Sequence, residues 1–322
     1  MSNVLINTKG MDYEAYLKKV GQDKSLLLRT PGEFYDDFIN YDNTLHGDRA
    51  PWGETHAALA FGEGQLSIWA GINGHGKSEL LGQVMAWQMS RSRVCIASFE
   101  MQPKETMMRM CRQTCSAPTP TTELKKAWLD FADNQMYIYD QVDRVTPEAV
   151  LGMVHYAFHE LNCKHIVIDS LTKCGVGRDF EKQAMMADAL QNAAKKWGCH
   201  IHLVVHTRKG ETEYDKPGKF DVRGASEIAD LADNVLIVYR NKKKEELIQS
   251  GKLEIEIDGE LMSTDKVMPD GMLLHVKNRH GGEELTYKLW RNQAGQYCSN
   301  HNRVINHPEL DILTAHYHTT KR

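Results

Sequence analysis

Apolar residues along this chain alternate between short continuous runs and longer segments of helical spacing. The run at 65–70 predicts a buried strand, and the segment 79–89 carries apolar residues three and four positions apart, as on one face of a helix. The alternation continues downstream. Because strands separated by helices favour a mainly parallel sheet, the pattern predicts an α/β fold. Further strands are expected at 93–99, 136–139, 165–169, 201–206 and 234–239, and helices at 104–115, 123–132, 147–161 and 181–197.

The pattern changes after residue 240. A charged helix is expected over 240–249, and a surface hairpin within 252–270. Two apolar runs at 272–279 and 284–290 then flank the turn at 280–282, which predicts a pair of antiparallel strands. The mainly parallel sheet therefore gains an antiparallel C-terminal edge.

The first 50 residues are polar and aromatic, with short helical patterns at 13–20 and 31–39. They carry too few apolar residues for a core of their own. We expect an arm that packs on the main domain or reaches a neighbouring subunit, and a small recognition domain is the alternative. The chain then divides into an arm at 1–50, one domain at 51–298 and an irregular tail at 299–322.

Composition narrows the class of protein. Of the 322 residues, 41% are hydrophobic and 25% are charged, and the net charge of −4 excludes a global basic field for nucleic acid. Any binding to DNA must therefore use local basic residues. Seven cysteines without paired spacing argue against disulfides and a zinc site. The sequence has neither an apolar stretch of membrane-spanning length nor a signal peptide, so we expect a cytoplasmic protein without a membrane partner.

Between the first strand and the first helix of the domain, residues 71–78 fit the phosphate-loop pattern G-x-x-x-x-G-K-[ST]. Glycines let several backbone N–H groups face one point, and the helix N-terminus adds its positive dipole end. Lys77 is then expected to reach the β- and γ-phosphates, and Ser78 to ligate Mg²⁺. A glycine-rich turn without function is the alternative, which the flanking strand and helix disfavour. The predicted nucleotide-binding residues are Gly71, Asn73, Gly74, Gly76, Lys77, Ser78 and Glu79.

Three polar residues stand at the C-terminal ends of expected strands, at the edge where α/β sheets bind ligands. Asp169 has the form of a Walker B carboxylate that holds Mg²⁺ through water. Glu100 either orients the water that attacks a γ-phosphate or supplies a negative charge at the start of the following helix. His206 either senses the γ-phosphate or is structural, as most single histidines at strand ends are.

Basic residues gather at two further places. Lys277 and Arg279 alternate onto one face at the end of an expected strand, a placement that indicates an anionic neighbour. The loop after His206 either lies on a solvated surface or grips a phosphate backbone. Its cations are Arg208, Lys209, Lys216 and Lys219.

The phosphate loop and several segments after it come in the same order as in DnaB-like hexameric replicative helicases, and the chain resembles that family. The chain has His206 where bacterial DnaB proteins carry glutamine, and Arg208 and Lys209 follow it. In these residues it is more similar to the phage primase-helicase and mitochondrial Twinkle branch. The resemblance implies a RecA-like P-loop NTPase core, ATP and Mg²⁺ as cofactors, and a ring, expected to be hexameric, that moves on single-stranded or forked DNA. It covers about residues 50–298 and rests on the phosphate loop and on 98–101, 107–110, 167–169, 204–206, 223–233 and 277–279.

The resemblance also implies a role for each matching residue. Lys77 and Ser78 resemble the phosphate and Mg²⁺ ligands, and Asp169 resembles the carboxylate that holds the metal. Glu100 resembles the catalytic base, and His206 resembles the γ-phosphate sensor.

Two further implications concern neighbours. Arg279 resembles the arginine finger that enters the next subunit's site, with Lys277 beside it. No primase domain is expected in the first 50 residues, so the chain resembles a stand-alone helicase module of phage type, with a primase or loader acting in trans. The loops after Asp169 and His206 resemble the family's DNA loops, with the candidate residues Lys173, Arg178, Arg208, Lys209, Lys216 and Lys219.

Two other functions remain open from the sequence. One is a RecA- or KaiC-like ATPase acting in recombination, packaging or regulation, and the other is a nucleotide-switched loader or adaptor. Both would share the nucleotide-site residues, so unwinding of a forked duplex is what separates them from a helicase.

Overall fold

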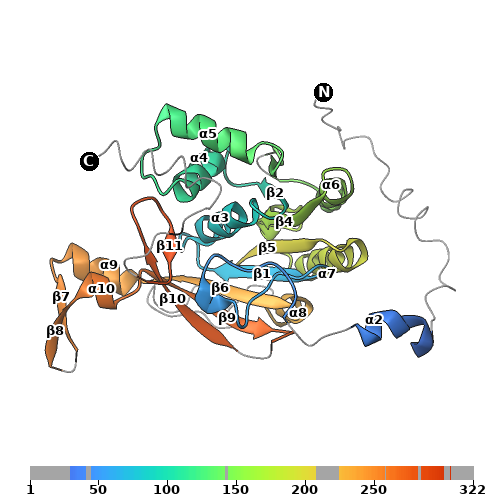
Figure 1. Cartoon of the computed structure of the whole chain (residues 1–322). Coiled ribbons are helices and arrows are strands. Elements are labelled where there is room, and N and C mark those ends of the chain that lie inside the picture. Colours follow the sequence, from blue (N-terminus) through green and yellow to red (C-terminus); the bar gives the residue numbers. More distant parts are fainter. Residues whose placement is uncertain are drawn as a thin grey trace.

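A large twisted sheet forms the centre of the protein (Figure 1). The computed structural model describes residues 30–40, 45–141, 144–207, 225–257, 259–281, 284–300 and 305. In these ranges the sheet has nine strands in the order β11-β10-β9-β6-β1-β5-β4-β2-β3. The strands are β1 (Leu66–Gly71), β2 (Arg93–Ser98), β3 (Met136–Ile138), β4 (Cys163–Asp169), β5 (His200–His206), β6 (Asn234–Arg240), β9 (Gly271–Asn278), β10 (Leu285–Arg291) and β11 (Tyr297–Cys298).

Strands β1 to β6 pair in parallel, whereas β9, β10 and β11 add an antiparallel edge. The predicted α/β fold with an antiparallel C-terminal edge is confirmed. Because parallel strands place their carboxyl ends at one edge, the residues that follow β1, β2, β4 and β5 meet there.

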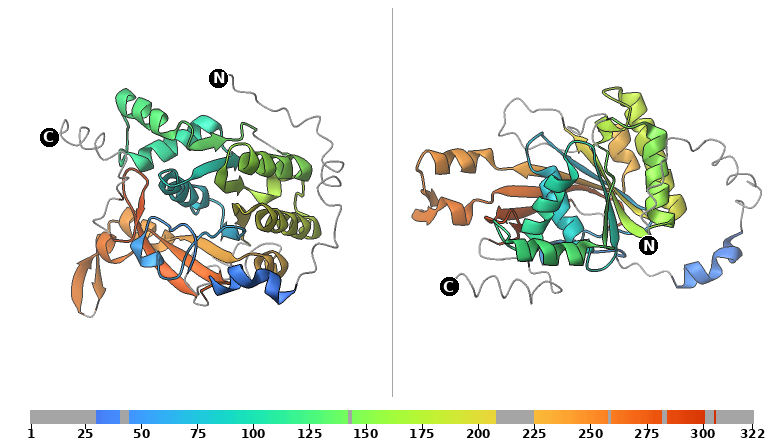
Figure 2. Two further views of the ribbon diagram at one scale, coloured as in Figure 1. Left: turned by 45° about the vertical axis from the view of Figure 1, so that its right-hand side comes forward. Right: turned by 90° about the horizontal axis from the view of Figure 1, so that it is seen from above.

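Helices cover both faces of the sheet, as Figure 2 shows from two sides. One face is covered by α3 (Lys77–Gln88), α4 (Pro103–Thr114) and α5 (Thr122–Ala132), and the other by α6 (Pro147–His159), α7 (Phe180–Trp197) and α8 (Ala225–Leu231). Each face has its own hydrophobic core. Alternate residues of β1 point to opposite cores, so that Trp69 packs with the α3 group and Ile68 with the α6 group. Within the described ranges, no helix combines the length and apolar character that crossing a membrane requires.

The N-terminal segment contains the predicted helix at 31–39, built as a 3₁₀ turn, Pro31–Phe34, followed by α2 (Tyr35–Ile39). Figure 1 shows this segment standing apart from the sheet. The predicted helix at 13–20 lies outside the described residues. Residues 45–65, here called the strap, lead into β1 and bury Trp52 and Phe61 against the α3 side of the sheet.

The segment after β6 corrects one boundary. Arg240 ends β6, and α9 (Lys242–Gln249) begins after Asn241, whose side chain accepts from the N–H of Lys244. The predicted surface hairpin is present as β7 (Glu254–Ile257) and β8 (Glu260–Ser263), followed by α10 (Thr264–Val267). The fully buried Lys244 ammonium pairs with Asp265 at 2.8 Å and Asp270 at 2.7 Å, which ties this module to the sheet.

A chain of buried hydrogen bonds joins the strap to the sheet at the edge opposite the phosphate loop. Trp69 donates from its indole to Nδ1 of His202 at 3.1 Å, and Nε2 of His202 lies 3.1 Å from Nδ1 of His165. Nε2 of His165 contacts Oδ2 of Asp48, in the strap, at 2.9 Å. An indole N–H can only donate, so Nδ1 of His202 must accept and carries no proton. Nε2 of His202 then carries the proton and donates to Nδ1 of His165, whose own Nε2 donates to Asp48. His202 and His165 are therefore both neutral with the proton on Nε2. Burial lowers the pKa of His202, and lowers that of the adjacent His200 to about 3.

Candidate nucleotide site

The phosphate loop joins β1 to α3, and two of its glycines have positive φ angles and close neighbours. At Gly71, with φ of +154°, a Cβ would lie 2.5 Å from the carbonyl oxygen of Val238. At Gly76, with φ of +86°, a Cβ would lie 2.6 Å from the Tyr297 hydroxyl. At Gly71 the clash would be with the backbone, so the backbone path requires glycine there, whereas at Gly76 the clash would be with the end of a side chain.

Lys77 begins α3 and turns its ammonium back into the loop. Nζ donates to the carbonyl oxygens of Gly71 at 3.0 Å and Ile72 at 3.1 Å. Burial lowers the pKa of Lys77 to about 8, while the carboxylates of Asp169 and Glu100 oppose that shift. A phosphate in the loop would supply the negative charge that favours the ammonium form.

Ser78 and Asp169 come together from α3 and β4. The Ser78 hydroxyl donates to Oδ2 of Asp169 at 2.5 Å. Burial raises the pKa of Asp169, and the hydrogen bond from Ser78 opposes the rise. A hydroxyl and a carboxylate are oxygen ligands that suit Mg²⁺. Among the described residues, no group of three or more His, Cys, Asp or Glu side chains is placed to hold a metal ion.

Glu100 follows β2 and lies beside the residues that end β4 and β5. The Ser170 hydroxyl donates to Oε1 of Glu100 at 3.0 Å, and Nε2 of His206 lies 3.7 Å from the same oxygen. The pKa of Glu100 is lowered to about 2, first by its interaction with His206 and then by Ser170, with burial acting in the opposite direction. Glu100 is therefore an ionised carboxylate at the strand edge, close to Lys77 and Asp169.

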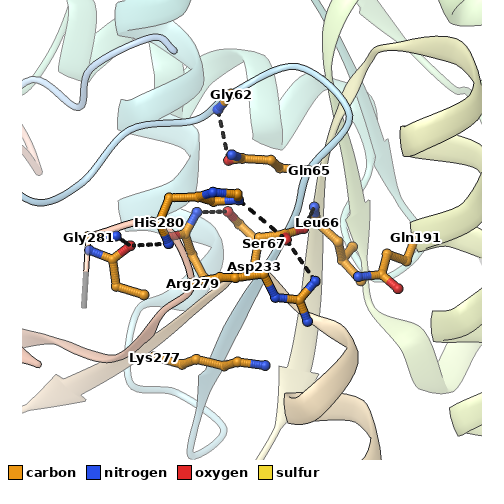
Figure 3. Close-up of polar contacts among 12 residues, drawn as sticks. Gly62, Gln65, Leu66, Ser67, Gln191, Asp233, Lys277, Arg279, His280 and Gly281 are labelled. Atoms are coloured by element: carbon orange, nitrogen blue, oxygen red, sulfur yellow. Dashed lines mark hydrogen bonds and ion pairs between the residues drawn. The ribbon is translucent and has the colours of Figure 1, made fainter. Parts of the chain in front are cut away.

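Lys277 and Arg279 lie away from this cluster, at the start of β1 and β6 (Figure 3). Arg279 donates to Asp233 at 3.1 Å and to the carbonyl oxygen of Asp230 at 2.9 Å. Lys277 donates to the carbonyl oxygens of Ala229 and Asp230 at 2.8 Å. The Asp233 carboxylate is an anionic neighbour of Arg279, and neutral carbonyl oxygens at the C-terminal end of α8, where the helix dipole is negative, accept from both cations. Because β1 runs from this edge to the phosphate loop, neither cation lies in the candidate nucleotide site of this chain.

A polar cavity of about 260 Å³ borders the outer side of the phosphate loop, and sequence reasoning missed most of it. Glu79 is bonded there to Arg291, with Nη2 of Arg291 2.6 Å from Oε1 of Glu79. The hydroxyl of Tyr297 donates to the other oxygen of Glu79 at 3.3 Å. Arg240 reaches the carbonyl oxygen of Gly74 at 3.4 Å. No motif marks these three residues. Arg240 ends β6, the parallel neighbour of β1, whereas β10 and β11 bring Arg291 and Tyr297 back across the sheet to the loop.

The candidate DNA residues are only partly described. Arg178 lines a cavity of about 370 Å³ beside His206, and Lys173 ends the 3₁₀ turn Leu171–Lys173. The other four candidates, Arg208, Lys209, Lys216 and Lys219, lie outside the described residues.

The sequence matches the DnaB-like helicase C terminal domain family over residues 56–297. Two solved structures share the fold with a TM-score of 0.66. One is the ATPase domain of a phage helicase, at 13% identity, covering 83% of this chain and 96% of that one. The other is a DnaB-like replicative helicase described with its interactions with primase, at 14% identity, covering 88% of this chain and 70% of that one. No curated protein sequence matches the chain.

Proposed function

Because the chain belongs to the DnaB-like helicase C-terminal domain family, we propose that it is an ATP-driven motor that moves along single-stranded DNA and separates the strands of a duplex. The family makes it a P-loop helicase ATPase of the replicative type. The observation that carries the proposal is the meeting of five side chains at one edge of the sheet. They are Lys77, Ser78, Glu100, Asp169 and His206.

Each of these side chains has a chemical role in hydrolysis. Lys77 would bind the β- and γ-phosphates, and Ser78 and Asp169 would hold Mg²⁺, which when bound neutralises phosphate charge. Glu100 is ionised and can orient and deprotonate the attacking water. His206, within 3.7 Å of Glu100, would report whether the γ-phosphate is present.

We propose that the active form is a ring, and specifically a hexamer, in which Arg279 acts on the neighbouring subunit. Arg279 and the phosphate loop occupy opposite ends of β1, so a head-to-tail arrangement would place the finger of one subunit at the nucleotide of the next. An arginine supplied in trans stabilises transition-state charge and makes hydrolysis depend on assembly. Lys277, which lies within β9 two residues before Arg279, would support it.

The arm supports the same assembly. Phe34, Tyr35, Phe38 and Ile39 are 42–72% exposed on the segment that stands apart from the sheet. Apolar side chains gathered on one short helix favour docking on another protein surface. We propose that the arm docks on a neighbouring subunit.

DNA would pass through the ring and contact local cations, because a net charge of −4 leaves no global basic field. The residues proposed for this contact are Lys173, Arg178, Arg208, Lys209, Lys216 and Lys219. A primase or loader would act as a separate partner, as the primase interaction of the similar DnaB-like helicase suggests.

A subunit-mixing experiment tests the proposal. ATP hydrolysis is measured with and without single-stranded DNA for the wild type, Glu100→Ala, Arg279→Ala and a one-to-one mixture of the two variants, and unwinding is measured on a forked duplex. We expect DNA to stimulate the wild type, each variant to be inactive, and the mixture to recover activity at interfaces that pair an intact Glu100 with an intact Arg279. Normal hydrolysis by Arg279→Ala would contradict the trans assignment, and a wild type that never unwinds a fork would contradict the helicase assignment.

A further inference from the structure

The cavity beside His206 lies between the segments that follow β4 and β5. It is lined by Thr172, Arg178 and Phe180 from the first segment and its helix, and by His206 from the second. Phe180 is a large aromatic residue that is 49% exposed, and it starts α7 two positions after Arg178. A flat aromatic surface next to a guanidinium is the combination that binds a base and its phosphate in single-stranded nucleic acids.

A hydrogen-bond chain leads from this cavity to Glu100. The hydroxyls of Thr172 and Ser170 lie 3.0 Å apart, and the Ser170 hydroxyl lies 3.0 Å from Oε1 of Glu100. An ionised carboxylate can only accept hydrogen bonds, so the Ser170 hydroxyl donates its one hydrogen to Glu100. Thr172 must therefore donate to Ser170, which fixes the direction of the chain.

Ser170, in the middle of this hydrogen-bond chain, is shielded from water, whereas Thr172, at its end, is partly exposed. Ser170 is fully buried, so water cannot replace Thr172 as the donor to its hydroxyl. Thr172 is half-buried in the 3₁₀ turn and lines the cavity, so it is the end of the chain that faces the cavity. The backbone around the turn is held by bonds from the N–H of Lys173 to Ser170 O at 3.0 Å and from the N–H of Val145 to Lys173 O at 3.1 Å. A shift of the turn would therefore move Thr172 and Ser170 together.

We propose that this cavity takes one nucleotide of single-stranded DNA, stacked on Phe180, and that the Thr172–Ser170 chain transmits its presence to Glu100 as a change in the position of the carboxylate. Thr172 and Ser170 are positioning residues that act through Glu100. The inference rests on the proposed function and adds to it the place where DNA binding meets hydrolysis.

The test separates the hydroxyl of Thr172 from its shape. Thr172→Val keeps the branched shape and removes the donor, whereas Thr172→Ser keeps the donor and removes the methyl group. Thr286→Val, at an exposed threonine of β10, is the matched control. For each protein, kcat and KM for ATP are measured with and without oligo-dT, and oligo-dT affinity is measured by fluorescence anisotropy with a non-hydrolysable ATP analogue.

We expect Thr172→Val to lower the ratio of DNA-stimulated to unstimulated kcat by about fivefold or more, because Glu100 loses the hydrogen-bond chain that positions it. KM for ATP and oligo-dT affinity should change by less than about twofold, because Thr172 positions Glu100 without binding either ligand strongly. Thr172→Ser should keep at least about half of the stimulation, and Thr286→Val all of it. Phe180→Ala should instead weaken oligo-dT binding by about fivefold or more, through loss of a stacking surface.

Three results would overturn the inference. If DNA stimulates Thr172→Val as much as the wild type, or if the valine and serine variants lose stimulation equally, the hydrogen-bond chain does not transmit the signal. If Phe180→Ala binds oligo-dT with unchanged affinity, the cavity is not a nucleotide-binding site. If the wild type itself shows no stimulation, the proposed function fails as well, so the two failures are distinguishable.

Discussion

Arg279 and Asp233 form an ion pair between the end of β9 and the start of β6, with Nη1 of Arg279 3.1 Å from Oδ1 of Asp233. The carboxylate is 4% exposed and the guanidinium 37%. The second oxygen of Asp233 accepts from the backbone N–H of Leu66, the first residue of β1, at 2.9 Å. Asp233 therefore links the proposed finger of a subunit to the strand that ends in the phosphate loop of that same subunit (Figure 3).

Under the proposed role of Arg279 at a neighbouring site, Asp233→Asn should lower DNA-stimulated hydrolysis by about tenfold, because Arg279 loses the charge that orients it. The free energy of unfolding should fall by about 1–3 kcal/mol, since two hydrogen bonds to a buried charged acceptor are weakened. Steady-state ATP hydrolysis and urea unfolding measure the two effects separately.

Asp230→Asn is the matched control for Asp233→Asn. Asp230 is exposed and offers Arg279 and Lys277 only its backbone carbonyl oxygen, which the substitution keeps. Hydrolysis by this variant should match the wild type. If Asp230→Asn and Asp233→Asn lose the same activity, the orienting role of the Asp233 carboxylate is wrong.

A second prediction concerns the close approach of Gly76 to Tyr297. Gly76→Ala should abolish ATP binding, because the new Cβ would lie 2.6 Å from the tyrosine hydroxyl. Adding Tyr297→Phe removes that hydroxyl, and the next ring atom lies 3.6 Å away. The double variant should recover measurable ATP binding, at a cost of about 1–2 kcal/mol that remains from the left-handed φ of +86°. Fluorescent nucleotide titration of both single variants and the double variant checks this, and equal loss in Gly76→Ala and the double variant would contradict it.

Sequence reasoning located the residues whose position depends on local patterns. A phosphate loop needs its glycines, Lys77 and Ser78 at fixed spacing, and Asp169 and His206 end strands that the apolar runs predict. Parallel strands then bring those ends to one edge without further information. The same reasoning placed Lys277 and Arg279 on one strand and indicated an anionic neighbour. The position of Asp233 beside them depends on the pairing of β6 with β9.

Residues that reach the site through antiparallel returns could not be predicted in the same way. Arg291 meets Glu79 only because β10 and β11 fold back beside α3, and no sequence period encodes that contact. The histidines of the buried chain stand within apolar runs that predict strands and nothing more. His165 and His202 share a face because the register of β4 and β5 pairs His165 with His200, and His202 lies two residues farther along the same face of β5.

The buried histidines predict that stability falls in mild acid. Burial lowers the pKa of His200 to about 3 and that of His202 well below its usual value of 6.5, so the unfolded chain binds protons that the folded chain does not. Stability is then fully present above pH 6.5 and is lost as the pH drops toward the folded pKa values. Each such histidine should contribute a slope of up to about 1.4 kcal/mol per pH unit between about pH 5 and 6.5. His275, whose pKa is lowered to about 4 by burial, acts in the same direction.

Urea unfolding at several pH values measures this slope. Asp48 does not contribute in that window, because its pKa is lowered in the folded chain and its carboxylate is ionised in both states. His202→Gln should reduce the slope as well as the stability at about pH 7.5, because one titrating group is removed and the bond from Trp69 is altered. A variant with lower stability but the wild-type slope would show that His202 is not a source of the acid sensitivity.

The last prediction concerns the charge that Arg291 neutralises. Glu79 stands in the first turn of α3, where the phosphates of a nucleotide would lie, and its carboxylate is paired with Arg291 at 2.6 Å. Arg291→Gln leaves that carboxylate without its cation next to a polyanion, so we expect ATP affinity to fall by about tenfold, or about 1.4 kcal/mol. Glu79→Gln in the same chain removes the repulsive charge, and the double variant should bind ATP more tightly than Arg291→Gln alone.

The double-mutant cycle decides between two roles for Arg291. If Arg291 acts by neutralising Glu79, the two substitutions are energetically coupled and the double variant recovers most of the lost affinity. If Arg291 contacts the nucleotide directly, Glu79→Gln cannot restore binding and the losses add. Nucleotide titration at two salt concentrations strengthens the distinction, because repulsion from the partly exposed Glu79 carboxylate weakens as salt rises, and the defect of Arg291→Gln should shrink with it.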